Sequence, residues 1–200
     1  RIRPDAERAQ SQCSQVVRDP PPAWGNVSTE GEAPLIVTAR LPRDLHARYT
    51  ALRKAHFPAE RNYLEAHVTL FHALPAMCEE EACTYLRRLA AEFAPIDGHV
   101  EGIMSLGRGT AVKLISADML LLRELIADHF NGLLTQQDQH RPRLYVTIQN
   151  KVSGKEAKAL QAALAGTIEH RAFQFTGVDL FRYRGGPWEK GKGFDFRGHG

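Results

Sequence analysis

The chain has 200 residues, 43% of them hydrophobic, and a formal net charge of +3, which suits one or at most two compact domains with a sizeable core. No apolar run approaches the ~18 residues of a membrane span, and the first residues lack the apolar centre of a signal peptide. Three cysteines without a C-x-x-C pair argue against disulfides and a cysteine zinc site, so we expect a soluble cytoplasmic protein whose mild positive charge permits an anionic ligand.

The first 33 residues differ from the rest of the chain. They contain Pro20-Pro21-Pro22, few large apolar residues and no alternating pattern. We interpret residues 1–33 as a disordered or irregular N-terminal tail.

From Pro34 onward, hydrophobic residues recur with the periods of helices and strands. Leu45, Tyr49 and Leu52, for example, have the spacing of one helix face, and Gly107-Arg108-Gly109 has the composition of a hairpin turn. In chain order the pattern predicts a strand at 35–41, a helix at 43–56, a strand at 65–74, a helix at 79–93, a hairpin of 99–106 with 111–116, a helix at 117–130, a strand at 144–149, a helix at 154–165 and a strand at 172–183. The glycine-rich residues 189–200 are expected to form an irregular C-terminal tail.

Two short stretches of the chain resemble each other. The sequences AHVTLFHA (66–73) and RLYVTIQN (143–150) share Val-Thr followed by a large aliphatic residue, 78 residues apart. Each copy falls on the second strand of a β-α-β-α-β series, so we interpret the similarity as an internal duplication. The predicted fold is therefore α+β: a bilobal, duplicated domain over residues 34–188, with antiparallel sheets lining a central groove. Its lobes are expected at about 34–106 and 110–184, and the prediction leaves open that they intertwine.

Alternation along these two strands predicts which side chains share a face. One face of each strand carries polar and aromatic residues, namely His67, Thr69 and Phe71 in the first copy and Tyr145, Thr147 and Gln149 in the second. If the two strands are partners, their hydroxyls can donate hydrogen bonds to phosphate oxygens while the ring groups handle protons on either side of phosphorus. Such chemistry needs no metal.

With these residues the chain resembles the two-histidine (2H) phosphoesterase superfamily, in its bacterial 2′-5′ RNA ligase or RNA 2′,3′-cyclic phosphodiesterase branch. Members of that family carry two His-x-Thr/Ser-x motifs in a duplicated, bilobal α+β fold. The resemblance covers about Pro34 to Arg184, and His67-Val68-Thr69-Leu70 matches the first motif. The second motif, Tyr145-Val146-Thr147-Ile148, has tyrosine where the family has histidine.

The resemblance implies a phosphoesterase without metal or other cofactor. Its substrates would be RNA 2′,3′-cyclic phosphates or 2′-5′ linkages, and its partners RNA ends or cyclic and 2′-phosphorylated nucleotides. We expect a monomer.

Tyr145 leaves the chemistry open. A tyrosine with a pKa near ~10 is protonated at neutral pH, so it can donate a proton to a leaving oxygen but is a poor acceptor from water. If the site is active, Tyr145 is then the acid and His67 the base. Alternatively, Tyr145 is a packed structural residue in a non-catalytic binder of RNA ends or nucleotides, or a variant within an otherwise active enzyme.

Of the two histidines that could replace the missing one, His140 is the better candidate, because His72 falls on the opposite face from His67.

Recognition of a phosphate and a base needs cations and a stacking surface near the groove. The residues predicted for this role are Arg40, Phe71, Gln149, Lys151 and Arg184. Aromatic residues of the run 182–188 (RYRGGPW) could stack on a base, although the same run also fits a solvated basic edge. The other histidines are interpreted as surface or structural residues: His46, His56, His99, His129, His170 and His199.

Overall fold

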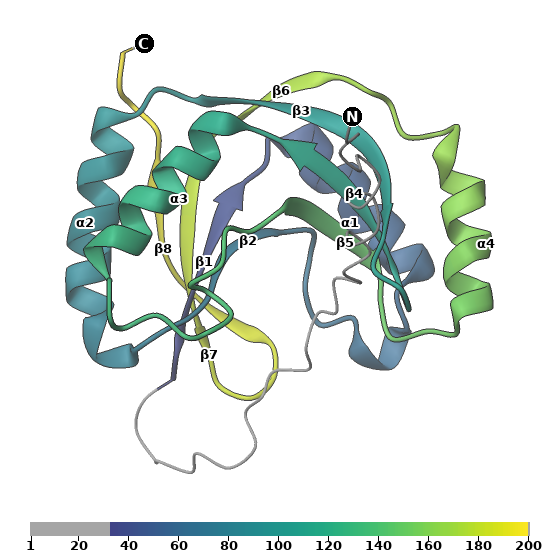
Figure 1. Ribbon diagram of the computed structural model, residues 1–200, viewed down its shortest axis with the longest axis horizontal. Coiled ribbons are helices and arrows are strands. Elements are labelled where there is room, and N and C mark those ends of the chain that lie inside the picture. Colours follow the sequence, from purple (N-terminus) through teal and green to yellow (C-terminus); the bar gives the residue numbers. More distant parts are fainter. Residues whose placement is uncertain (1–32, 200) are drawn as a thin grey trace, which may run out of the picture.

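The computed structural model describes residues 33–199, which form two β-sheets and four α-helices (Figure 1). The predicted tail at residues 1–33 lies outside the described residues, apart from its last position. The helices are α1 (Arg43–His56), α2 (Glu79–Glu92), α3 (Ala117–His129) and α4 (Gly154–Ala165), with short 3-10 turns η1 (Ala59–Arg61) and η2 (Ala76–Cys78). The strands are β1 (Leu35–Arg40), β2 (Val68–Leu74), β3 (Ile96–Ser105), β4 (Thr110–Ile115), β5 (Leu144–Gln149), β6 (Ala172–Phe175), β7 (Gly177–Tyr183) and β8 (Trp188–Asp195).

The fold class is the predicted one, α+β with antiparallel sheets. One sheet has the strand order β2-β1-β7-β8 and the other β5-β4-β3-β6, and every neighbouring pair is antiparallel. Helix α2 packs against β7 and β8, α3 and α4 pack against β3, and α1 packs against β5. The edge strands β2 and β5, which carry the two Val-Thr pairs, lie next to each other where the sheets meet.

The two sheets do not correspond to the two halves of the chain. The first half of the chain supplies β1 and β2 to the first sheet but β3 to the second. The second half supplies β4 and β5 to the second sheet but β7 to the first. The order β2-β1-β7 in the first sheet therefore corresponds to β5-β4-β3 in the second. In space, the predicted lobes at 34–106 and 110–184 are therefore intertwined through these strands. The hairpin turn at 107–109 is the reason, since it pairs β3 with β4 and so draws β3 into the second sheet.

The C-terminal region contains more regular structure than predicted. The strand expected at 172–183 is two strands, β6 and β7, which belong to different sheets and are separated at Thr176. The irregular tail expected at 189–200 is wrong for most of its length, because β8 pairs with β7 as far as Asp195. Glycine there serves close packing: a Cβ on Gly193 would lie 2.4 Å from Nη2 of Arg40 and 2.6 Å from Oδ1 of Asp179.

A β-bulge interrupts the alternation of both Val-Thr strands at equivalent positions. On β2, Thr69 pairs with Thr38 and Phe71 with Val37, which leaves Leu70 as the extra residue. On β5, Thr147 pairs with Ala111 and Gln149 with Thr110, which leaves Ile148 as the extra residue. The recurrence of this irregularity supports the duplication that the sequence predicts.

Local sequence explains several element ends. The Ser116 hydroxyl accepts a hydrogen bond from the backbone of Met119 and caps α3, and Ser153 with Glu156 forms a complete capping box at α4. Within residues 33–199, no helix is both long and apolar enough to cross a membrane.

Candidate functional site

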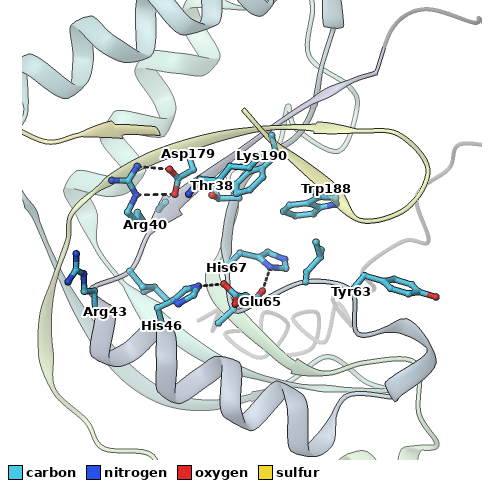
Figure 2. Close-up of a pocket in the computed structure, with 15 residues that line it drawn as sticks. Thr38, Arg40, Arg43, His46, Tyr63, Glu65, His67, Asp179, Trp188 and Lys190 are labelled. Carbon is cyan, nitrogen blue, oxygen red and sulfur yellow. Dashed lines mark hydrogen bonds and ion pairs between the residues drawn. The ribbon is translucent and has the colours of Figure 1, made fainter. Parts of the chain in front are cut away.

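A cavity of about 460 Å³ opens beside the first sheet and contains His67 (Figure 2). Its walls come from β1, β7, β8, the start of α1 and the loop before β2. The lining residues are Thr38, Ala39, Arg40, Leu41, Arg43, His46, Tyr63, Leu64, Glu65, Ala66, His67, Asp179, Phe181, Trp188 and Lys190.

His67 faces this cavity because the chain leaves the sheet just before β2. The pairing of β1 with β2 ends at Ala39 and Val68, so His67 lies outside the ladder. The Thr50 hydroxyl on α1 accepts a hydrogen bond from the backbone N–H of Ala66 at 3.0 Å. This bond holds the loop on the helix, and the His67 ring is left in the cavity.

The contacts of His67 define its tautomer. Nδ1 lies 2.8 Å from the carbonyl oxygen of Glu65, and because a carbonyl only accepts, Nδ1 carries the proton. Nε2 then has the lone pair. The Trp188 ring lies against the imidazole, with a centroid separation of 4.6 Å and a tilt of 53° (Figure 2).

Burial and a nearby cation keep His67 neutral. The His67 side chain is partly exposed at the cavity, and its partial removal from water lowers its pKa to about 4; the positive charge of Arg53 contributes further in the same direction. At neutral pH the imidazole therefore has an available lone pair on Nε2, which is what a general base requires.

The cations of the cavity differ from those predicted. Arg40 lines it, but its Nε donates to Asp179 at 3.0 Å and its other nitrogens bond to Asp179 and Asp195, so two carboxylates neutralise it. The hydrogen bond with Asp179 raises the pKa of Arg40. Arg43 and Lys190 also line the cavity, and neither forms an ion pair with any residue in the described part of the chain. These two are the cations available to a phosphate.

The remaining motif residues lie on the strands and do not line this cavity. Thr69, Tyr145 and Thr147 are partly exposed, and their neighbours Val68, Val146 and Ile148 are buried, as the alternation predicts. Tyr145 stays within the ladder opposite Lys113, unlike His67. The two motifs are thus adjacent in space but differ in how their ring residues are held.

Phe71 and Gln149, two of the predicted binding residues, are buried and do not line the cavity. Phe71 is fully buried, and the guanidinium carbon of Arg123 lies 4.5 Å from its ring centroid. Gln149 is 8% exposed. The physical reason is the bulge at Leu70 and Ile148, which turns the following residue toward the core.

The other predicted side chains also lie elsewhere. Lys151 is exposed with a positive φ of 60°, and Arg184 donates to Glu189 at 2.5 Å, so neither lines the cavity. His140 is exposed and outside the cavity. His72 points away, with Nδ1 2.9 Å from Oδ1 of the buried Asp138.

Several lining residues were missed by the sequence analysis. His46, which was interpreted as a surface or structural residue, lies 3.5 Å from the Glu65 carboxylate at the cavity. Asp179 and Lys190 come from the last two strands, one of which was not predicted. Trp188 belongs to the run proposed for stacking, and its aromatic character was the available signal.

The chain is similar to known proteins in sequence and in fold. The family model for the 2′-5′ RNA ligase superfamily matches residues 41–187. No curated protein matches the chain. Among solved structures, TT0787 of Thermus thermophilus is similar with a TM-score of 0.56 and 16% identity, covering 84% of this chain and 100% of that one. E. coli LigT in complex with NADP⁺ gives a TM-score of 0.53 and 16% identity, covering 83% of this chain and 99% of that one. At this identity the structural likeness concerns the fold.

Proposed function

The chain belongs to the 2′-5′ RNA ligase superfamily, and from this premise we propose that it is a metal-independent phosphoesterase acting on RNA 2′,3′-cyclic phosphates or 2′-5′ linkages. The observation that carries the proposal is the state of His67: a neutral imidazole that lines the cavity, with its proton on Nδ1 and its lone pair on Nε2. This is the group that activation of water requires.

The proposed reaction opens the cyclic phosphate by hydrolysis. His67 Nε2 takes a proton from water while the water oxygen bonds to phosphorus. The bond from phosphorus to O3′ then breaks, O3′ receives a proton, and the product is a 2′-phosphomonoester with a free 3′-hydroxyl. Tyr145 is the proposed donor of that proton, because a phenol is protonated at neutral pH. Thr69 and Thr147 lie on the two strands next to the cavity, outside its lining, and are the proposed hydrogen-bond donors at that border. Together with the positive charges of Arg43 and Lys190 they would stabilise the charge that develops on phosphorus.

A nucleotide is the substrate class that best fits the cavity. Its volume of about 460 Å³ lies within the usual range for small-molecule sites. Tyr63 and Trp188 lie at one end and Arg43 and His46 at the other, with His67 between them (Figure 2). The aromatic end suits a base and the cationic end a phosphate. Binding of NADP⁺ by the structurally similar LigT supports the same assignment.

Binding can be tested separately from turnover. We expect a 2′-nucleotide such as 2′-AMP at ten times its Kd to raise the Tm by about 3–6 °C in low salt, because a ligand that binds only the folded state stabilises it. Differential scanning fluorimetry measures this shift. Trp188→Ala should weaken the protection, whereas Met77→Ala, at a residue that is 78% exposed and outside the cavity, should leave it intact. Absence of protection at millimolar ligand would contradict the site.

The reaction is expected to be insensitive to chelators. Among residues 33–199, no three His, Cys, Asp or Glu side chains gather in a way that could hold a metal ion. Hydrolysis of a 2′,3′-cyclic nucleotide should therefore proceed at the same rate with and without EDTA. A rate that EDTA abolishes and zinc or manganese restores would contradict metal independence.

One observation favours a second candidate, a binder of RNA ends or nucleotides without turnover. Tyr145, which we interpret as standing in place of a second motif histidine, lies within the β5 ladder, outside the cavity that contains His67. Thermal protection by 2′-AMP without detectable hydrolysis of any cyclic nucleotide would support this binder over the enzyme.

A further inference from the structure

Arg53 is a charged residue in the interior between the two motif strands. It lies on the buried face of α1 with Leu45, Tyr49 and Thr50, and it is 4% exposed. Its guanidinium carbon lies 4.5 Å from the Phe57 ring centroid. The sequence analysis did not single it out.

The hydrogen bonds of Arg53 join the surroundings of both motifs. Nε donates to the carbonyl oxygen of Leu64 at 3.2 Å, three residues before His67. Nη1 donates to the carbonyl oxygen of Thr147, in the second motif, at 2.7 Å. Nη2 donates to Oδ1 of Asn62 at 3.3 Å, and Asn62 Nδ2 donates in return to the Arg53 carbonyl oxygen at 3.2 Å. One side chain thus fixes the His67 loop to β5.

All these acceptors are neutral oxygens. No carboxylate in the described part of the chain forms an ion pair with Arg53, in contrast to Arg40, which has two carboxylate partners. A buried charge without a counter-ion is unfavourable, so its presence beside a site calls for a function. Burial lowers the pKa of Arg53 to about 10, which leaves the guanidinium charged at neutral pH.

We propose that Arg53 is a positioning residue for the phosphoester reaction: it holds the His67 loop against β5 and adds an uncompensated positive charge beneath the two motifs. This inference rests on the proposed function, because the fixed His67 loop and the added positive charge promote the reaction only if the substrate is anionic. The charge attracts a phosphate and opposes protonation of His67. The three hydrogen bonds keep the base at a fixed place relative to Thr147.

Other titratable and charged groups also surround His67, and they are the same in the native protein and in each Arg53 variant. His46 lies on α1 and His72 on β2, and both act on His67 in the same direction as Arg53. Lys190 on β8 and the Arg40–Asp179 pair between β1 and β7 line the cavity. Because these groups stay in place, a change in the titration of His67 on substitution of Arg53 reports Arg53 itself.

The test uses Arg53→Gln and Arg53→Lys, with Arg123→Gln as the matched control. Arg123 is equally buried at 4%, lies on α3 and donates to the carbonyl oxygen of Asp138, away from the cavity. The His67 imidazole is titrated by NMR in each folded variant, and kcat and KM are measured on a 2′,3′-cyclic nucleotide.

Three results are expected. Arg53→Gln moves the titration of His67 toward neutral pH by about one pH unit, and kcat falls by at least about 10-fold. Arg53→Lys keeps the charge, so the titration stays near that of the native protein while kcat falls. Arg123→Gln lowers the Tm without moving the titration of His67.

Two outcomes would overturn the inference: an unchanged titration in Arg53→Gln, or native kcat in Arg53→Lys. If Arg53→Gln does not fold, Arg53→Lys decides alone. The titration does not depend on turnover, so an inactive native protein would count against the proposed function while the charge effect of Arg53 is still measured.

Discussion

Replacing His67 by glutamine should lower the turnover of a 2′,3′-cyclic nucleotide by about 10²–10⁴-fold, the contribution of a positioned proton-transfer group. Glutamine retains polarity and approximate size but has no basic nitrogen. In the native protein kcat/KM should rise with pH through about 4 and be flat by neutrality, because the pKa of His67 is lowered to about 4 and only the neutral ring acts as base. If the base had an ordinary histidine pKa, kcat/KM would instead rise with pH near ~6.5.

His140→Gln is the matched control for this substitution. His140 is exposed and outside the cavity, so we expect its variant to retain the native rate and pH profile. A native rate in His67→Gln would remove His67 from the reaction. A large loss in His140→Gln would assign the base to the loop before β5.

Tyr145→His is expected to raise turnover by about 10²–10⁴-fold, because in the proposed reaction it would supply a second imidazole for proton transfer. The gain should disappear when His67→Ala is added, since the two groups act on opposite sides of phosphorus. Steady-state hydrolysis of 2′,3′-cyclic nucleotides measures both variants. This result would identify position 145 as a lapsed histidine.

Tyr145→Phe distinguishes the other possibility, that the phenol is already the working acid. It removes only the hydroxyl, so turnover would fall by a similar factor. Tyr85→Phe is the control, because the Tyr85 hydroxyl bonds the Leu125 carbonyl at 3.1 Å outside this cavity. No change in Tyr145→His together with loss of activity in Tyr145→Phe would show that tyrosine is the evolved acid.

Elements with strong local signals were predictable from the sequence. Helix α4 and strand β5 have both ends as predicted, and α4 begins with a capping box that can be recognised in Ser153 and Glu156. Strand β8 was missed because glycines at 191 and 193 resemble a loop, whereas Gly193 is required by the Arg40–Asp179 pair. That requirement comes from strands far apart in the sequence, which no local pattern records.

The proposed catalytic residues of the candidate site were predictable only because they belong to a recognisable motif. The His-x-Thr pattern located His67, but strict alternation misplaced Phe71 and Gln149, since a bulge is invisible in the hydrophobic pattern. Arg53 belongs to no motif, and an arginine in a helix is ordinarily expected at the surface. Its role depends on two backbone carbonyls, and one of them lies 94 residues away.

The exchange of third strands between the two sheets has a consequence for how the molecule is assembled. Strand β7 pairs along its length with β1, and β3 pairs with β4. A chain ending after β3 would therefore keep the β1–β2 pair but lack β7 on the other side of β1, and its β3 would be free to pair with a second molecule. In this sense the fold is the single-chain form of a strand-swapped dimer. The turn at 107–109 joins β3 to β4 within one chain, so each strand has a high effective concentration near the other. The pairing of β3 with β4 therefore does not depend on the protein concentration, as it would in a dimer.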